Sequence, residues 1–290
     1  MPLHLQFRRY RLPFRTPVRT AHGLWAEREG LIVRLTDAAE GAVDAVGWGE
    51  AAPIPWFGTE TADLAEAALR DLGEWVEPER LAELPAKLPC TRQALQDARA
   101  DLARATAAVT GTGNAAAGGA ESAAPKPYLG VAALLPAGRA VLAAIGPKAE
   151  GGFRIFKWKV GVGDAADELA LLDDVCAALP SGAKLRLDAN GAWDRRRAER
   201  WLERCADRPV EFVEQPIAPE TRGADDLLLG LAGDFPTRLA LDESLVGAGD
   251  VERWLGAGWP GIYVVKPLLL GDAEAALAAL AKAKADVVFS

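Results

Sequence analysis

The sequence has few of the residues that bind zinc or form disulfides. Its 290 residues include two histidines, His4 and His22, and three cysteines, Cys90, Cys176 and Cys205. The cysteines are odd in number and no CxxC motif occurs, so neither a zinc site nor a disulfide framework is expected. Unpaired thiols are typical of proteins of the reducing cytoplasm.

Long apolar runs and an excess of positive charge are also missing. No apolar run approaches the roughly 18 residues of a membrane-spanning helix, and MPLHLQFRRYRLPF at the start lacks a signal-peptide core. No membrane segment is therefore expected, and a cytoplasmic location is favoured. The net charge of −8 argues against nucleic acid or an anionic membrane as the main partner. It leaves an anionic small molecule open, because nearby lysines and a bound metal ion outweigh distant surface charge.

The first third of the chain predicts an α+β domain. Some segments alternate as antiparallel strands do and others carry apolar residues at helical spacing. The strand segments are residues 3–14, 30–37 and 41–53, and the helical ones are residues 59–76 and 88–109. The Gly-, Ala- and Pro-rich stretch from Gly111 to Pro127 favours a flexible connector, with a surface insertion within one domain as the alternative. We expect an N-terminal capping domain with its linker over residues 1–126.

The remainder, residues 127–290, alternates between strands and helices. Strands are expected at residues 128–136, 153–161, 183–190, 209–216, 237–244, 260–267 and 285–290. This order predicts an α/β fold, a (β/α) barrel of the TIM type. A closed eight-stranded barrel needs roughly one more βα unit. Either the chain is truncated after the seventh strand or the barrel closes irregularly.

Five charged residues lie at the ends of predicted strands. They are Lys159, Asp188, Glu214, Asp242 and Lys266, and 24 to 29 residues separate each from the next, which is about one βα unit. The carboxyl ends of parallel barrel strands meet in one mouth, where the active site lies. Three carboxylates there form an all-oxygen site suited to Mg²⁺ or Mn²⁺. Lysines beside a divalent cation are candidates for proton transfer.

The carboxylates and Lys266 also have purely structural interpretations. A single carboxylate at a strand end often caps the following helix, but three at successive strand ends favour a shared metal site. Glu243 could replace its neighbour Asp242 as a ligand. Strand alternation lets only one of the two point inward, and we favour Asp242. Lys266 could simply form a salt bridge to one of the carboxylates.

Lys157 and Lys159 lie two residues apart on one strand and therefore share a face. Lysines on an outward, solvated face are the alternative. Phe156, Trp158 and Val160 occupy the other face, which suits packing beneath helices, so the lysines are expected to face the barrel lumen. Two ammonium groups close together disfavour protonation, which makes one of them a base near neutral pH.

Two loops of the N-terminal domain are candidates to fold over a neighbouring active site. One contains His22, although a lone histidine more often has no chemical role. The other is PIPWFGTE, where Trp56 and Phe57 present aromatic surface.

The motifs KWK, DAN, EQP, DES and VVKP, in this order, resemble those of the enolase superfamily in its muconate-lactonizing-type branch. Within that branch the segments PFRTPVRTAHGLWAEREG, GWGEAAPIPWFGTET, VAALLPAG and GIYVVKPLLLGD resemble the o-succinylbenzoate synthase family. The resemblance covers nearly the whole chain. It implies an α+β capping domain over a modified (β/α) barrel.

The resemblance also implies roles for the mouth residues. Asp188, Glu214 and Asp242 would hold Mg²⁺, Lys159 would be the acid/base residue, and Lys266 would face it across the site. Substrate-binding positions would be Lys157, Asn190 and Ser290, where the family's seventh strand leads into a serine-rich acidic loop. Gln215 would support the metal site from behind.

The activity that the family implies is the syn dehydration of 2-succinyl-6-hydroxy-2,4-cyclohexadiene-1-carboxylate to o-succinylbenzoate in menaquinone and phylloquinone biosynthesis. Two alternatives stay open. An N-acylamino acid racemase or dipeptide epimerase would use Lys159 and Lys266 as bases on opposite faces of its substrate. A catalytically silent metal-binding homologue is the other. The sequence does not indicate an oligomeric state.

Overall fold

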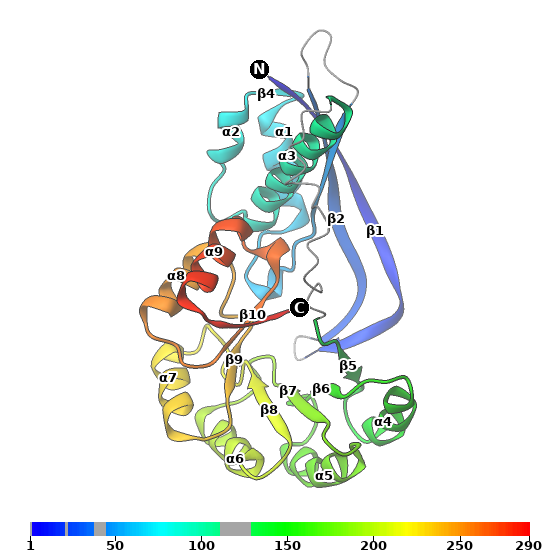
Figure 1. Ribbon diagram of the computed structural model, residues 1–290, viewed down its shortest axis with the longest axis vertical. Helices are drawn as coiled ribbons and strands as arrows, with labels where there is room; N and C mark the ends of the chain where they lie inside the picture. The colour runs from blue at the N-terminus through cyan, green and yellow to red at the C-terminus, as the bar shows by residue number, and fades with distance from the viewer. Residues whose placement is uncertain (1, 21–22, 38–44, 111–128) are drawn as a thin grey trace.

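The computed structural model of the protein describes residues 2–20, 23–37, 45–110 and 129–290. Two sheets with their helices are stacked along the long axis of the molecule (Figure 1). The expected linker and the loop residue His22 lie outside the described residues, so the domain boundary remains a prediction. None of the helices in the described part of the chain combines the length and apolarity that a bilayer crossing requires.

The N-terminal sheet is antiparallel, with the strand order β3-β2-β1-β4. Its strands are β1 (Leu3–Thr20), β2 (Gly23–Asp37), β3 (Val46–Ala51) and β4 (Trp75–Val76). Helices also accompany it: the 3₁₀ turn η1 (Pro55–Phe57), α1 (Ala62–Leu72), α2 (Pro78–Ala82) and α3 (Pro89–Thr110). Alternation sends Leu31, Val33 and Leu35 of β2 into the core beneath these helices, where all three are fully buried. The predicted capping fold is therefore present, with β4 and α2 in addition.

Two glycines let α3 lie directly on β3. A Cβ at Gly47 would come within 1.9 Å of the carbonyl oxygen of Ala98, and one at Gly49 within 1.9 Å of that of Ala94. Any larger residue would therefore push helix and strand apart. The cap gains a closely packed layer at this point.

The second sheet is parallel, and its strands follow one another in sequence order from β5 to β11. They are β5 (Ala132–Leu135), β6 (Ile155–Lys159), β7 (Lys184–Asp188), β8 (Val210–Glu214), β9 (Leu239–Leu241), β10 (Ile262–Val265) and β11 (Asp286–Phe289). The helices between them are α4 (Ala140–Glu150), α5 (Ala165–Ala178), α6 (Arg195–Cys205), α7 (Ala224–Asp234), α8 (Ala248–Gly256) and α9 (Ala273–Ala283), with a 3₁₀ turn, η2 (Pro267–Leu269). The sheet curls with its helices on the outer face (Figure 1). The predicted barrel-type fold is confirmed, and within the described residues β5 and β11 remain unpaired with each other.

The barrel wall buries apolar side chains on both of its faces. The outer face packs beneath the helices, where Phe156 and Trp158 of β6 and Trp201 of α6 are fully buried. The lumen holds a smaller cluster, in which Phe212 and Val264 are buried. The alternation predicted for β6 is thus present: its aromatic side chains face the helices and its lysines face the lumen.

The cap contacts the barrel at the carboxyl ends of the strands. Leu269 of η2 belongs to the cap's apolar core. The side-chain oxygen of Gln93 on α3 accepts a hydrogen bond of 2.8 Å from the backbone N–H of Ala273, at the start of α9. This contact fixes the cap over the edge of the sheet where the charged residues lie.

Candidate active site

The five predicted strand-end residues come together at one edge of the parallel sheet. Lys159, Asp188 and Glu214 are the last residues of β6, β7 and β8, and they are direct partners across neighbouring strands. Asp242 follows β9 and Lys266 follows β10. The three carboxylates are buried, each at most 3 % exposed. The lysines keep about a fifth of their side chains exposed, so they form the accessible surface of the site.

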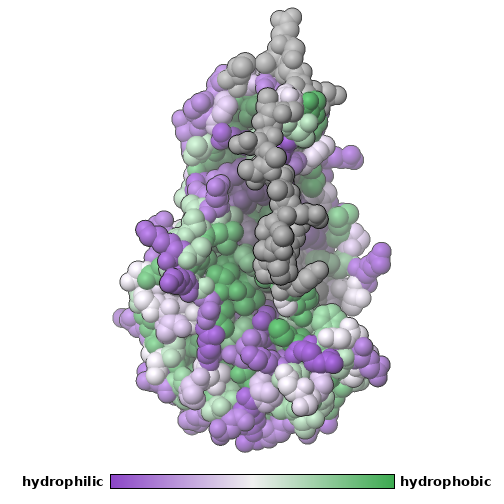
Figure 2. Space-filling model, in the orientation of Figure 1, coloured by the Kyte–Doolittle hydropathy of each residue, from purple (hydrophilic) through white to green (hydrophobic). Residues whose placement is uncertain are grey.

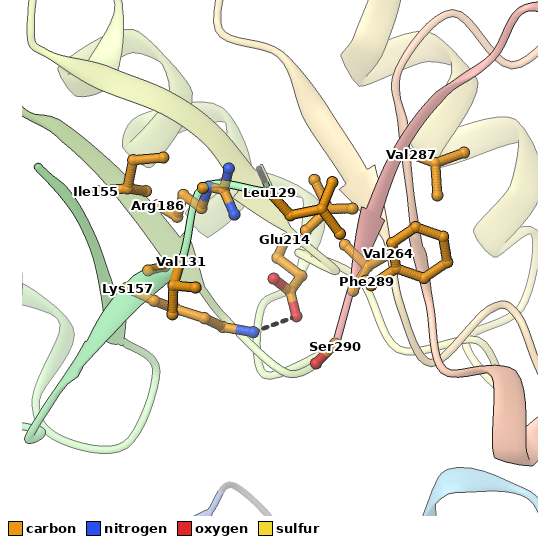
Figure 3. A pocket seen from close by; sticks show the side chains of 13 residues that line it. Leu129, Val131, Ile155, Lys157, Arg186, Glu214, Val264, Val287, Phe289 and Ser290 are labelled. Carbon is orange, nitrogen blue, oxygen red and sulfur yellow. Dashed lines mark hydrogen bonds and ion pairs between the residues drawn. The ribbon is translucent and has the colours of Figure 1, made fainter. Parts of the chain in front are cut away.

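Each buried carboxylate is paired with lysine. The ammonium group of Lys157 lies 2.6 Å from a carboxylate oxygen of Glu214 and 3.0 Å from one of Asp188. Figure 3 shows the first of these pairs inside the barrel. Lys159 lies 3.2 Å from Asp188, and Lys266 forms an ion pair with Asp242. The salt bridge considered as the structural alternative for Lys266 is therefore present.

The pKa of Lys157 is raised rather than lowered. Its burial favours the neutral amine, but the carboxylates of Glu214 and Asp188 outweigh that effect. The expectation that crowding turns one of the two lysines into a base thus does not apply to Lys157. It stays charged and acts as a fixed cation.

The pKa values of the three carboxylates shift in different directions. Burial raises the pKa of Glu214, and the neighbouring charge of Asp188 adds to this. Burial also raises the pKa of Asp242 despite its contact with Lys266. For Asp188 the two nearby lysines overcome burial, so its pKa is lowered. The lysines therefore do not fully compensate the buried negative charge of the site.

Asn190 links the proton-transfer candidate to a further carboxylate. Its side-chain oxygen accepts a hydrogen bond of 2.6 Å from Lys159, and its side-chain nitrogen donates one of 2.9 Å to Glu243. The other carboxylate oxygen of Glu243 is buried and has no hydrogen-bond partner among the residues that the structure describes. Burial, assisted by the charge of Asp188, raises the pKa of Glu243 to about 6.

The position of Glu243 corrects the alternation argument. We expected only one of Asp242 and Glu243 to point inward, yet each contacts a residue of the mouth. β9 ends at Leu241, so both acids lie beyond the strand, where two-residue alternation no longer applies.

Gln215 holds the segment that carries these two acids. Its side-chain oxygen accepts hydrogen bonds from the backbone N–H groups of Asp242 (2.8 Å) and Ser244 (3.2 Å). Its side-chain nitrogen donates to the hydroxyl of Ser244 and to the carbonyl of Ile217, each at 2.8 Å. Every polar atom of this fully buried amide is satisfied, so it fixes the backbone behind the carboxylates.

Asn190 and Gln215 share an uncommon backbone conformation. Their φ angles are +45° and +35°, in the left-handed region. Asn190 lies two residues after the end of β7, and Gln215 lies directly after the end of β8. Asparagine tolerates this region better than most residues do. The turn at each strand end places the amide of Asn190 beside Lys159 and the amide of Gln215 behind the carboxylates.

Two contributors were not singled out as site residues from the sequence. Phe57 of the cap lies with its ring centre 4.5 Å from the ammonium group of Lys266, a cation–π contact. The sequence predicted that Trp56 and Phe57 would both present aromatic surface. Trp56 is 40 % exposed, but Phe57 is buried. Arg186 points into the lumen and donates a hydrogen bond of 2.7 Å to the carboxylate of Glu211. Its guanidinium group lies over the ring of Phe212. It stands two residues before Asp188, so the same-face spacing that identified the lysines could have found it.

Ser290 lies at the end of a groove beside the site. A cavity of about 470 Å³ separates β5 from β11, and Lys157, Glu214 and Ser290 lie at one end of it (Figure 3). The rest of its lining is largely apolar and includes Val131 and Phe289. Figure 2 shows apolar side chains gathered on this face of the molecule. The structure thus brings Ser290 near the lysine and carboxylate end of the lumen.

The donor set suits a hard divalent cation. Asp188, Glu214 and Asp242 offer only oxygen atoms, which Mg²⁺ prefers. In the described residues these carboxylates contact lysines, and no cluster of three acidic, histidine or cysteine side chains has metal-ligand spacing. With Glu243, four carboxylates face three lysines, and the raised pKa values mark the surplus of negative charge. A bound divalent cation would neutralise that surplus, so the chemistry of these carboxylates is compatible with a Mg²⁺ site.

Two family models match the chain. Residues 140–288 match the model described as enolase C-terminal domain-like, and residues 4–102 match the MenC N-terminal domain. The o-succinylbenzoate synthase of Thermosynechococcus vestitus is 39% identical over 272 residues, which are 93% of this chain and 77% of that protein. The chain belongs to the o-succinylbenzoate synthase family of the enolase superfamily.

The chain is also similar to a dipeptide epimerase and to a solved o-succinylbenzoate synthase structure. A hydrophobic dipeptide epimerase of Roseobacter litoralis is 30% identical over 250 residues, covering 82% of this chain and 67% of the epimerase. The crystal structure of o-succinylbenzoate synthase from Thermosynechococcus elongatus, complexed with Mg in its active site, superposes with a TM-score of 0.81 at 36% identity. That match covers 99% of this chain and 83% of the other. The resemblance predicted from the strand-end motifs is confirmed.

Proposed function

We propose that the protein is a Mg²⁺-dependent lyase that converts 2-succinyl-6-hydroxy-2,4-cyclohexadiene-1-carboxylate to o-succinylbenzoate and water. The observation that carries this proposal is the 39% identity to an o-succinylbenzoate synthase over 93% of the chain. The ring of three carboxylates and three lysines at the barrel mouth supports it. The place of this reaction is menaquinone and phylloquinone biosynthesis.

Asp188, Glu214 and Asp242 would hold the metal ion, for which Mn²⁺ is a possible substitute. When bound, the cation draws charge from the substrate carboxylate and so acidifies the adjacent C–H group. Gln215 keeps the backbone of Asp242 in place through its 2.8 Å hydrogen bond. Through the bound cation the three carboxylates would orient the substrate carboxylate, and they take no proton from the substrate.

Lys159 is the residue proposed to move the proton. Its neutral amine takes the proton from the ring carbon beside the carboxylate, and the resulting ammonium returns it to the hydroxyl that leaves as water on the same face. Loss of water makes the ring aromatic, which drives this second step. Asn190 orients the amine through its 2.6 Å hydrogen bond. Lys157 remains charged and attracts the substrate carboxylate.

Lys266 is proposed to act through its charge alone. It directly follows β10, which three strands separate from β6, and so approaches the substrate from the other side. A fixed ammonium group there stabilises negative charge that develops on the substrate. Phe57 and Asp242 hold its side chain in place.

Dehydration of the cyclohexadiene substrate tests this proposal directly. The purified protein with Mg²⁺ should form o-succinylbenzoate, and removal of the metal with EDTA should abolish turnover until Mg²⁺ is restored. Lys159→Ala should be inactive at unchanged thermal stability. A protein that binds Mg²⁺ yet forms no product would instead be a catalytically silent homologue.

An epimerase is the second candidate, because a hydrophobic dipeptide epimerase is 30% identical to this chain. In that reaction Lys159 and Lys266 would exchange the α-proton from opposite faces. Incubation of dipeptides or N-acylamino acids in D₂O, followed by NMR, separates the candidates. Exchange from both enantiomers without dehydratase activity would replace the first proposal by the second.

We further propose a cytoplasmic protein whose partner is a small carboxylate rather than nucleic acid or a membrane. The net charge of −8 supports this view. The three cysteines form no disulfide with one another, which is consistent with a reducing compartment.

A further inference from the structure

Glu168 is a buried carboxylate that the reaction described above does not use. It lies in the first turn of α5 and is 4 % exposed. Among the residues that the structure describes, it forms hydrogen bonds but no ion pair with a lysine or arginine. A buried charge without a cationic partner is costly unless hydrogen bonds compensate it.

Its partners are three consecutive backbone N–H groups. Gly161, Val162 and Gly163 donate hydrogen bonds of 2.7, 3.2 and 2.9 Å to the two carboxylate oxygens. These residues form a loop that begins at Gly161, two residues after Lys159. Hydrogen bonds to an ionised acceptor are about twice as strong as neutral ones, so the loop is held at three successive points.

The helix itself does not need this arrangement. Asp164 already caps α5, because its side chain accepts hydrogen bonds from the N–H groups of Ala166 (2.9 Å) and Asp167 (3.2 Å). The bonds of Glu168 reach back beyond this cap to the preceding loop. Their effect is therefore on the loop rather than on the end of the helix.

The loop in turn packs against the loop that carries Asn190. Gly161 has φ +76°, and a Cβ there would lie 2.7 Å from the Cβ of Ala192 and 3.2 Å from the indole nitrogen of Trp193. Just before it, the N–H of Val160 donates a 2.9 Å hydrogen bond to the carbonyl of Asp188. A shift of the loop would be transmitted to both strand ends, β6 with Lys159 and β7 with its following turn.

We propose that Glu168 is a positioning residue that fixes the loop 161–163 and thereby sets the relative placement of Lys159 and Asn190. The inference rests on the proposed role of Lys159 in proton transfer. It predicts that loss of the Glu168 charge changes the chemical step more than substrate binding, because small misplacements of a reacting group cost rate.

The experiment compares Glu168→Gln with Asp164→Asn. Both changes replace a carboxylate on the same loop and helix by its amide, but only the first touches the N–H groups of 161–163. In Glu168→Gln we expect kcat to fall about 10-fold, with KM changed less than about 2-fold. In Asp164→Asn both constants should stay near wild type. Melting temperatures are measured for each, and activity is compared well below the lower one.

Hydrogen–deuterium exchange provides a readout that does not depend on the reaction. The amides of 161–163 should exchange faster in Glu168→Gln and at the wild-type rate in Asp164→Asn. The rate at which an amine-reactive reagent labels Lys159, followed by peptide mass spectrometry, should change only in Glu168→Gln. These two measurements stand even if the wild type proves to have another activity.

Three outcomes would overturn the inference. The first is unchanged exchange of 161–163 in Glu168→Gln. The second is faster exchange accompanied by unaltered Lys159 labelling. The third is a kcat loss matched by Asp164→Asn at the same melting temperature. If Glu168→Gln does not fold, Glu168→Asp, which keeps the charge but shortens the reach by one methylene, is held to the same three criteria.

Discussion

Lys266 lies between the carboxylate of Asp242 and the ring of Phe57. If it acts only through its charge, Lys266→Arg should retain measurable dehydration, whereas Lys266→Ala should lose about 10²–10³-fold in kcat. Steady-state kinetics measure both. Lys184→Ala is the matched control, because Lys184 is exposed at the opposite end of β7 and should leave kcat unchanged.

The result with arginine decides between the two roles of Lys266. An arginine cannot act as a base, so a Lys266→Arg variant as inactive as Lys159→Ala would contradict the electrostatic role. In an epimerase the same variant should stop α-proton exchange from one enantiomer only, which NMR in D₂O would detect.

Strand-end charges were predictable because parallel strands bring their carboxyl ends together whatever the details of side-chain packing. Two properties were not predictable. The inward position of both Asp242 and Glu243 depends on where β9 ends, and sequence patterns locate strand ends poorly. The raised pKa of Lys157 depends on Glu214 and Asp188, which come from other strands and whose approach distances only the structure gives.

The contact between α3 and β3 depends on glycine. Gly49→Ala should lower the free energy of unfolding by about 1–3 kcal/mol, because its Cβ would overlap the carbonyl oxygen of Ala94. Urea denaturation measures the change. Gly230→Ala in the interior of α7 is the control: its Cβ meets nothing, and alanine should stabilise that helix by about 0.5–1 kcal/mol. If Gly49→Ala were as stable as the control variant, the close approach of α3 to β3 would not contribute measurably to the free energy of unfolding.

Hydrophobic periodicity predicted most of these elements, since each helix and strand buries one face against a neighbour. The pattern missed β4, which is two residues long, and α2, which has five. Elements this short contain too few residues for a period to emerge. The length of β1 was also underestimated, because Pro13 coincides with an irregularity in its pairing with β2 and interrupts the alternation.

The groove between β5 and β11 leaves apolar side chains open to solvent. Val131 is 69 % and Phe289 49 % exposed, next to strand edges that can pair with other chains. The double variant Val131→Lys, Phe289→Lys should associate less at high concentration, as light scattering would report. Its control is Leu12→Lys, Leu64→Lys, which removes two leucines of similar exposure on the cap. Equal effects of the two double variants would show that the groove has no special part in association.

The sequential order of the parallel strands has a consequence for how the site would fail. Because each parallel strand pairs, within the described residues, only with its neighbours in the chain, fraying of this sheet would begin at β5 or β11 and proceed inward strand by strand. Lys159 stands on β6, one strand from an edge, whereas Asp188 and Glu214 stand on the better protected β7 and β8. A partly frayed molecule would thus lose the placement of Lys159, the proposed proton carrier, while its carboxylates remained together. Catalysis would disappear under mild stress before the capacity to bind a cation did.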